Sequence, residues 1–383
     1  MRPRRLLLVL SIALAFVAGF GSATLIDRSG STAGARGQAA LYHQILDDLQ
    51  RDYYRPVDVA RLGHAGIAGL LASLHDPYTI YFTPQQAREF DQGLSGSYTG
   101  IGTAVVLKDG WPTVTQVFPG SPAAAAGIRP GDAIVSIDGA PTAGKSVADD
   151  VARIVGPAGS HVRLEVRSAQ GRLAELTVTR GKISRPLVTS RLISDHGTTV
   201  GYLSLSAFAQ GAGQQVGRAV ASLQKRGAQA LVFDLRDDGG GLVDEAVKVA
   251  GVFLPPGSVV ATTKGLHAPT TVLKAAGHAT DLPLVVLVNG NTASASEIVT
   301  GALQDHRRAT VIGTRTFGKG VVQTLLPLRG GASLKITIAA YATPLGRNIQ
   351  HKGIEPAIVV AQPVHGHTDP ALARALRFIA AGR

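Results

Sequence analysis

Ser294 and Lys319 are the two residues whose types and surroundings could perform covalent chemistry. Ser294 follows the apolar, β-branched run Leu284–Val288 and precedes the helical pattern of 295–306, which predicts a position where a strand passes into a helix. A helix N-terminus offers backbone N–H groups and the positive end of the helix dipole, and both stabilise an anion that develops during acyl transfer. This position suits a nucleophile. The simpler interpretation is that Ser294 only caps the helix.

Lys319 follows Ser294 by 25 residues, in a glycine-flanked loop, 313–320, that leads into the β-like run 321–325. A lysine is protonated at neutral pH unless an apolar, partly dehydrated setting lowers its pKa, and only the neutral amine is a general base. The apolar neighbours that could provide this setting are Phe317, Val321 and Val322. A serine with a lysine base is a known variant of the serine-hydrolase arrangement.

Two other interpretations of this region are disfavoured. The loop 313–319 matches a phosphate-binding P-loop up to its last position, where Gly320 replaces the Ser/Thr that would bind magnesium, and a strand pattern follows where a P-loop needs a helix. A histidine base is the second alternative, and His306 is the nearest. On a continuous helix, however, His306 would lie about 18 Å along the axis from Ser294.

The segments 292–298 and 316–323 together resemble the signature of the carboxyl-terminal processing (tail-specific) serine peptidases. The order of the two segments and the spacing between them both match. The resemblance implies that Ser294 is the nucleophile, that Lys319 is the general base, and that Gln323 orients the lysine. It also implies that no metal or organic cofactor is needed.

A second glycine turn follows the predicted strand 230–235. Members of the resembled family usually read Asn-Pro-Gly-Gly here, and this chain departs from that pattern at Asp238 and Gly239. The resemblance implies an oxyanion hole formed by the N–H of Ala295 and by that of Gly240 or Gly241. The carboxylates in and before this turn, Asp234, Asp237 and Asp238, could instead be interpreted as a metal cluster. No histidine or distant carboxylate completes such a site, so a solvated turn is favoured.

Composition limits the possible partners. The chain has 383 residues, of which 45% are hydrophobic and 17% charged, so it is globular and long enough for two to three domains. It has no cysteine, which excludes disulfides, thiol catalysis and thiolate metal sites. The formal charge of +12 comes from scattered Lys and Arg residues without an aromatic-interleaved basic stripe. We therefore expect no nucleic-acid partner, and the charge favours an anionic membrane surface.

The N-terminus predicts export. A basic flank precedes 21 apolar or small residues, 6–26, which would form about 31 Å of helix. Residues 1–28 are thus expected to be a signal or membrane anchor, and 29–37 a polar linker. If the segment is retained, the protein is anchored with its domains on the periplasmic or extracellular side. If it is cleaved, the protein is secreted.

The chain beyond the linker predicts a multi-domain α/β protein. Residues 38–96 have a helical pattern, and 97–183 contain short β-like runs whose segment 122–139 resembles the core of a PDZ domain. The resemblance implies that the PDZ loop Thr99, Gly100, Ile101 and Gly102 binds a substrate C-terminus by presenting backbone N–H groups. A β-domain that merely packs is the alternative.

The remaining residues are expected to form the enzymatic part. Strands alternate with helices over 184–361, which predicts an α/β core with closing β-strands, and the tail 362–383 contains a helix. The hypothesis is an exported serine endopeptidase that recognises substrate C-termini through its PDZ domain, with homo-oligomerisation possible. The alternative is a catalytically silent, membrane-tethered PDZ scaffold.

Overall fold

The computed structural model describes residues 15–16, 32–195, 197–277, 279–361 and 368–382. The chain forms two compact units, a larger one of Met1–Phe90, Ser190–Phe208 and Ala212–Arg383, and a smaller one of Asp91–Thr189 and Ala209–Gly211. The segment expected to be a signal or anchor lies outside the described residues except for β1 (Ala15–Phe16), which pairs in parallel with β14 (Gly241–Leu242). No helix in the described ranges is both long enough and apolar enough to span a bilayer.

The larger unit is built on a six-stranded sheet in the order β11-β12-β13-β17-β18-β21, whose strands run parallel from β12 to β21. Every residue of β13 and β17 is buried, as expected for parallel strands covered on both faces. The strands are β11 (Val188–Asp195), β12 (Thr198–Leu205), β13 (Ala230–Asp234), β17 (Leu284–Val288), β18 (Thr310–Gly313) and β21 (Ile358–Val359).

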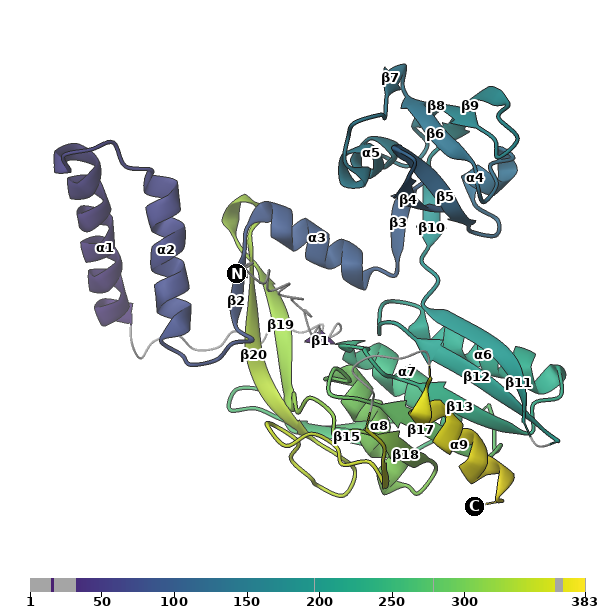
Figure 1. Cartoon of the computed structure of the whole chain (residues 1–383). Helices are drawn as coiled ribbons and strands as arrows, with labels where there is room; N and C mark the ends of the chain where they lie inside the picture. Colours follow the sequence, from purple (N-terminus) through teal and green to yellow (C-terminus); the bar gives the residue numbers. More distant parts are fainter. Residues whose placement is uncertain (1–14, 17–31, 196, 278, 362–367, 383) are drawn as a thin grey trace, which may run out of the picture. The chain divides into compact units, whose positions relative to one another are not determined.

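Helices cover both faces of this sheet (Figure 1). Val232 of β13 belongs to the cluster on which α9 packs, whereas the ring of the next residue, Phe233, lies 5.3 Å from that of Phe253 in α7. Successive side chains of a strand point to opposite faces, so α7 and α9 lie on opposite sides of the sheet. The helices are α6 (Ala212–Lys225), α7 (Val243–Phe253), α8 (Ala295–Asp305) and α9 (Pro370–Ala380). All four lie where the sequence predicted helices.

A second sheet of the larger unit has the order β16-β15-β20-β19, and β2 also pairs with β20. The closing strands expected from the sequence include β20, which is central here because both β19 and β2 pair with it. Gln323 on β19 faces Thr337 on β20 as its cross-strand partner. The strands are β15 (Val259–Lys264), β16 (Thr271–Lys274), β19 (Val321–Pro327), β20 (Ser333–Ala342) and β2 (Ile80–Phe82).

The N-terminal part of the described chain is mostly helical, as predicted, but with two differences. The linker expected over 29–37 is helical from Thr32 onward, because α1 begins there and continues the predicted helical region toward the N-terminus. The expected helical region 38–96 also contains β2, which is held by pairing with β20 rather than by local propensity. The helices are α1 (Thr32–Asp52), α2 (Val59–Ala72) and α3 (Pro84–Leu94).

The smaller unit contains a sheet in the order β4-β5-β6-β8-β9, whose five strands lie where the sequence predicted them. Its β4 is an edge strand, and α5 (Val147–Ile154) contacts it. A separate pair, β3 (Ser97–Gly100) with β10 (Gly181–Ser184), closes the unit. The sheet strands are β4 (Thr103–Lys108), β5 (Trp111–Val117), β6 (Ala133–Ile137), β8 (His161–Arg167) and β9 (Leu173–Thr179), and β7 (Ala140–Pro141) and α4 (Pro122–Ala125) flank them.

Candidate active site

Ser294 occupies a sharp turn between β17 and α8. Its backbone has φ 56° and ψ −112°, a combination that non-glycine residues adopt only when the surrounding structure enforces it. The side chain is fully buried, and Oγ has no hydrogen-bond partner among the residues that the structure describes. A serine that only capped the helix would use this oxygen to accept a backbone N–H. Ser294 is nevertheless the N-cap residue of α8, and Glu297 at N3 accepts its backbone N–H in the manner of a capping box.

Glu297 joins the serine turn to the lysine loop. Its Oε2 accepts the backbone N–H of Ser294 and that of Lys319, each at 2.9 Å. Its Oε1 accepts from the N–H of Gly318, at 2.8 Å, and from the hydroxyl of Thr316. One buried carboxylate thus holds two segments that are distant in sequence. The Ser-x-x-Glu spacing of a capping box was the available signal for this residue, but it indicated only a helix end.

Tyr341 of β20 connects the same two segments from another side. Its hydroxyl lies 3.0 Å from the carbonyl oxygen of Ser294 and 2.7 Å from that of Lys319. Burial raises the pKa of this phenol well above its ordinary value, so the hydroxyl keeps its proton and remains a donor. The backbones of Ser294 and Lys319 are therefore brought together at both their N–H and their C=O groups.

Lys319 is fully buried, and its surroundings favour the neutral amine. Burial and then the positive charge of Lys335 lower the pKa of Lys319 to about 7, although the carboxylates of Asp76 and Glu297 act in the opposite direction. Its Nζ lies 4.9 Å from the centre of the Tyr78 ring. The expectation that Phe317 would provide the apolar setting is wrong, because that side chain is 53% exposed. The aromatic cover comes from the turn after α2, which local sequence around the lysine could not reveal.

Gln323 is also fully buried on β19. Its Nε2 donates to Thr337 Oγ1 at 3.2 Å, and its Oε1 has no partner among the described residues. The amide therefore retains one acceptor in the dry interior of the larger unit. Such an acceptor is suited to receive a hydrogen bond from a cation that forms only during the reaction.

The glycine turn after β13 lies against the serine turn. A Cβ on Gly240 would approach Ala293 O to 2.7 Å, Ala295 N to 2.8 Å and Ser294 Cβ to 3.0 Å, and the φ of Gly240 is +96°. Only glycine fits there. The N–H of Gly240 donates to Asp238 Oδ1 at 2.8 Å. Burial raises the pKa of Asp238 to about 7, since its Oδ2 has no partner in the described ranges.

The three aspartates of this region do not converge on a common point. Asp234 pairs with Arg236 and Tyr202, Asp237 accepts from the side chains of two asparagines, and Asp238 faces the glycine turn. Among the described residues no group of three or more His, Cys, Asp or Glu side chains is arranged to hold a metal ion. The solvated-turn interpretation is also wrong for Asp238, which is completely buried.

The disfavoured alternatives have other places in the fold. His306 ends α8 with its Nε2 2.8 Å from the carbonyl oxygen of Val259, so it is engaged away from the serine turn. The loop that resembles a P-loop leads into β19, and not into a helix. Neither arrangement supports a histidine base or a nucleotide site.

The predicted peptide-binding loop belongs to the smaller unit, separate from the residues described above. Thr99 and Gly100 end β3, where Thr99 pairs with Lys182 of β10. The carbonyl oxygens of Ile101 and Gly102 accept from the N–H groups of Ala123 and Phe118, at 2.8 Å and 2.9 Å. Both carbonyls thus point into the unit. The next strand, β4, leaves one edge open beside α5.

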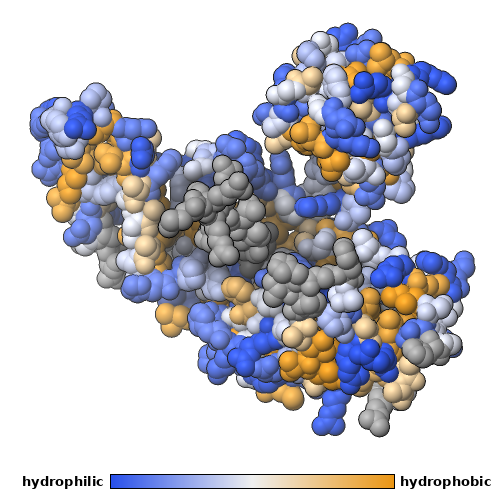
Figure 2. Space-filling model, in the orientation of Figure 1, coloured by the Kyte–Doolittle hydropathy of each residue, from blue (hydrophilic) through white to orange (hydrophobic). Residues whose placement is uncertain are grey.

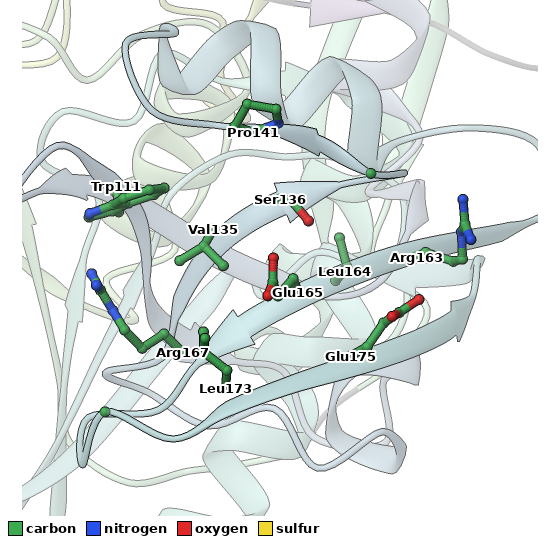
Figure 3. A pocket seen from close by; sticks show the side chains of 12 residues that line it. Trp111, Val135, Ser136, Pro141, Arg163, Leu164, Glu165, Arg167, Leu173 and Glu175 are labelled. Carbon is green, nitrogen blue, oxygen red and sulfur yellow. The ribbon is translucent and has the colours of Figure 1, made fainter.

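A cavity of about 680 Å³ lies elsewhere on the smaller unit (Figure 3). Its lining comes from β5, β6, β8 and β9 and carries charges of both signs, with the Arg167 guanidinium 5.3 Å from the centre of the Trp111 ring. None of the sequence-predicted site residues lines it. The cavity is therefore distinct from the β4 edge.

Comparisons with known proteins identify both parts of the chain. Residues 199–360 match peptidase family S41, and residues 113–168 match the PDZ domain. The chain is 38% identical to the carboxyl-terminal-processing protease of Synechocystis sp. over 82% of this chain and 75% of that protein. It is 33% identical to the carboxy-terminal processing protease CtpA of Bacillus subtilis over 91% of this chain and 74% of that protein.

A solved structure gives the same result. The photosystem II D1 C-terminal processing protease is 30% identical with a TM-score of 0.51, covering 88% of this chain and 96% of that one. These proteins are serine peptidases, and the comparisons give no support to a catalytically silent scaffold. The chain therefore belongs to peptidase family S41, as a PDZ-containing serine peptidase of the carboxyl-terminal processing type.

Proposed function

We propose that this peptidase cleaves peptide bonds with a Ser294–Lys319 dyad in which Gln323 orients the lysine. The observation that carries the proposal is the double connection of the two residues, through Glu297 and Tyr341, inside a dry interior. A serine with an unused hydroxyl and a lysine with a pKa of about 7 are thereby held in one small region. This is the combination that activates a serine near neutral pH.

In the proposed reaction, neutral Lys319 takes the proton of Ser294 as Oγ attacks the carbonyl carbon of the scissile bond. The resulting ammonium gives that proton to the leaving amine, and an acyl-enzyme remains on Ser294. Lys319 then takes a proton from water, whose oxygen attacks the ester and releases the new C-terminus. The ammonium gives this second proton to Ser294 Oγ as the ester bond breaks, so Ser294 and Lys319 regain their starting protonation states and no cofactor is required.

The oxyanion would be stabilised by the N–H of Ala295 and by one from the glycine turn. The N–H of Gly240 already donates to Asp238. Phe208 N–H donates to Gly240 O and Leu242 N–H to Phe208 O, a parallel pattern that directs the N–H of Gly241 away from Phe208. These bonds favour Gly241 as the second donor.

Substrate recognition is proposed to use the edge of β4. Exposed apolar side chains lie on both β4 and the neighbouring α5, namely Val106 and Leu107 on β4, Val151 on α5 and Val155 after it. An extended peptide would add to the open edge, and its carboxylate would reach the N–H groups around Thr99, Gly100, Ile101 and Gly102. This mode of binding selects substrates by their C-terminal residues.

We further propose that residues 1–28 direct export, so that the peptidase acts on the periplasmic or extracellular side, anchored or secreted. The apolar run 6–26 after the basic flank supports this. Separation of membranes from soluble material in the expressing cell, with the N-terminus of the protein sequenced, tests both export and cleavage. A cytoplasmic, uncleaved protein contradicts the proposal.

A homo-oligomer is also proposed, with the hairpin of α1 and α2 as the contact. No residue of α2 is buried, and Leu70 and Leu74 are 68% and 58% exposed. Figure 2 shows apolar surface on this hairpin. A second copy presenting the same surface would bury it. Analytical ultracentrifugation of Leu70→Glu should show a smaller species than the parent, and an unchanged mass contradicts this contact.

The dyad is tested by cleavage of casein, an unfolded protein. Ser294→Ala and Lys319→Ala should each abolish cleavage, because nucleophile and base act as one unit, whereas Gln323→Ala should reduce it less. Ser222→Ala, which alters an exposed serine on α6, is the matched control and should cleave at the parent rate. Cleavage by either dyad variant at the parent rate would refute the assignment.

A further inference from the structure

Thr337 of β20 connects Gln323 to the turn that follows α2. On one side it is the cross-strand partner of Gln323, whose Nε2 donates to its Oγ1 at 3.2 Å. On the other side its backbone N–H donates to Thr79 Oγ1 at 3.1 Å. Thr79 in turn donates its hydroxyl proton to Asp76 Oδ2 at 2.6 Å. A continuous set of hydrogen bonds therefore runs from the helical N-terminal region to the glutamine beside the base.

The direction of each hydrogen bond in this set follows from the number of available protons. An ionised carboxylate only accepts, so the hydroxyl of Thr79 donates to Asp76, and the Thr79 oxygen accepts the N–H of Thr337. Although burial alone would raise the pKa of Asp76, hydrogen bonds from the hydroxyl of Thr79 and from the backbone of Tyr78 and Thr79 lower it, so Asp76 is ionised at neutral pH. At the other end of the set, the hydroxyl oxygen of Thr337 accepts from Nε2 of Gln323.

This sequence of donors fixes the orientation of the Gln323 amide. With Nε2 committed to Thr337, the carbonyl oxygen Oε1 is the end of the amide that remains as an acceptor, and it is buried without a partner among the described residues. The glutamine is therefore prepared to accept a hydrogen bond, and not to donate one.

We propose that Asp76 and Thr337 are positioning residues that hold the Gln323 carbonyl ready for the Lys319 ammonium formed when the lysine takes the proton of Ser294. This inference rests on the proposed Ser294–Lys319 dyad and extends it into the N-terminal region. Asp76 acts through Thr337 and Gln323, and it touches neither the substrate nor the reacting atoms. The turn 76–79 thus helps to orient Gln323 beside Lys319, in addition to covering the lysine.

The charge of Asp76 gives the inference a second, electrostatic signature. The groups that act on the pKa of Lys319 are Lys335 from β20, Asp76 from the turn after α2, and Glu297 from α8, while the rings of Tyr78 and Tyr341 face the same region. Asp76 stabilises the ammonium and so opposes the effect of burial. Removal of its charge should lower the pKa of Lys319, whereas removal of the Thr337 hydroxyl should leave that charge in place.

The test measures the rate at which a fluorescent fluorophosphonate labels Ser294 of the full-length protein, by forming a phosphonate ester with loss of fluoride, between about pH 5 and about pH 9, where a general base titrates. Thr337→Val should lower the plateau rate about ten-fold or more, because Gln323 loses its fixed orientation, and Thr337→Ser should restore it. Asp76→Asn should lower the plateau and also move the midpoint of the profile to lower pH. The matched controls, Thr324→Val on β19 and Asp47→Asn on α1, should follow the parent profile.

The outcomes separate this inference from the dyad itself. If the fluorophosphonate labels Lys319→Ala at the parent rate, the assignment of the dyad is wrong. If Lys319→Ala is inert while Thr337→Val and Asp76→Asn follow the parent profile, the dyad stands and the positioning role is refuted. A purely structural role would lower the melting temperature of Thr337→Val and the amount of active protein without lowering the plateau rate of the protein that remains active. If Thr337→Val does not fold, Asp76→Asn decides by its plateau rate, because the charge of Asp76 acts on the midpoint with or without the positioning role.

Discussion

Three ionisable side chains act on the pKa of Lys319, and they do not act in the same direction. Lys335 adds to the effect of burial and lowers the pKa, whereas Asp76 and Glu297 raise it, with a pKa of about 7 as the result. Lys335 is itself 2% exposed, and its Nζ lies 5.5 Å and 5.6 Å from the ring centres of Phe82 and Phe90. The pKa of the proposed general base is therefore lowered by a second buried lysine.

The first prediction concerns this second lysine. The rate at which the fluorophosphonate labels the parent should rise with pH through about 7, because only deprotonated Lys319 can act as the proposed general base. Lys335→Met removes a positive charge and so should raise the pKa of Lys319, which moves the profile to higher pH and lowers the rate at neutral pH several-fold. Fluorophosphonate labelling as a function of pH measures it. Lys264→Met, on the exposed side of the neighbouring β15, is the control, and a profile that moves to lower pH contradicts the argument.

The second prediction concerns the stability of the fold. Asp238 has a pKa of about 7 in the folded chain against an ordinary value of 3.8, so its contribution to stability is present below about pH 4 and is lost as the pH rises through 7. Asp238→Asn should therefore gain stability relative to the parent as the pH rises, by at most about 4 kcal/mol above pH 7. Urea unfolding at about pH 5 and about pH 8 measures the difference. Asp47→Asn is the control, and a gain for Asp238→Asn that is equal at both pH values contradicts the prediction.

At the scale of elements, the site depends on two turns that follow neighbouring parallel strands. β13 and β17 pair in register from Leu231 with Leu284 to Asp234 with Leu287, so the glycine turn and the serine turn leave the sheet side by side at the same edge. The carbonyl oxygen of Asp238 accepts from the N–H of Ala293 at 3.0 Å and from Ser296 Oγ at 2.9 Å. The two turns thus form one rigid arrangement.

The third prediction tests this arrangement. Gly240→Ala would place a methyl group within 3.0 Å of three atoms of the serine turn. It should lower the rate of fluorophosphonate labelling about a hundred-fold or more, because Ala295 and Ser294 would be displaced. Gly227→Ala is the matched control, because Gly227 has a similar φ of +91° but open space around its Cβ. It should cost about 1–2 kcal/mol of stability and leave the rate unchanged. Equal losses of activity in both variants would show that backbone strain alone is responsible.

At the scale of the whole molecule, recognition and chemistry belong to different compact units. All residues of the proposed dyad, its oxyanion turn and its positioning network lie in the larger unit, whereas the PDZ domain lies in the smaller one. The chemistry should therefore tolerate changes in the smaller unit that alter substrate choice.

The fourth prediction separates these two functions. Amidation removes the charge of a peptide's C-terminal carboxylate, which the N–H groups around Gly100 to Gly102 are proposed to bind. The parent should cleave an amidated peptide less efficiently than the free acid, while a variant without residues 97–183 should not distinguish them. Competition between the two peptides, followed by mass spectrometry, measures this. Equal cleavage of both peptides by the parent contradicts tail recognition through the PDZ domain but leaves the dyad intact.

The sequence by itself determined the elements and the family of this protein. Local periodicity placed β17, α7, α8 and α9, because a buried run of β-branched residues or a repeat near 3.6 depends only on neighbours along the chain. Two short motifs around Ser294 and Lys319 were enough to indicate the peptidase family. The same local information was wrong about Phe317 and about the linker from Thr32 onward.

The tertiary structure alone decided what surrounds the base. Tyr78, Asp76, Lys335 and Tyr341 act on Lys319 from segments that are far away in sequence, and none of them carries a local signal for that role. Whether Asp238 is solvated or buried depended in the same way on the turn packed against it. Burial and electrostatic interaction depend on distance in space, and sequence patterns report that distance only within one element. The pKa of about 7 for Lys319 is consequently a property of the fold.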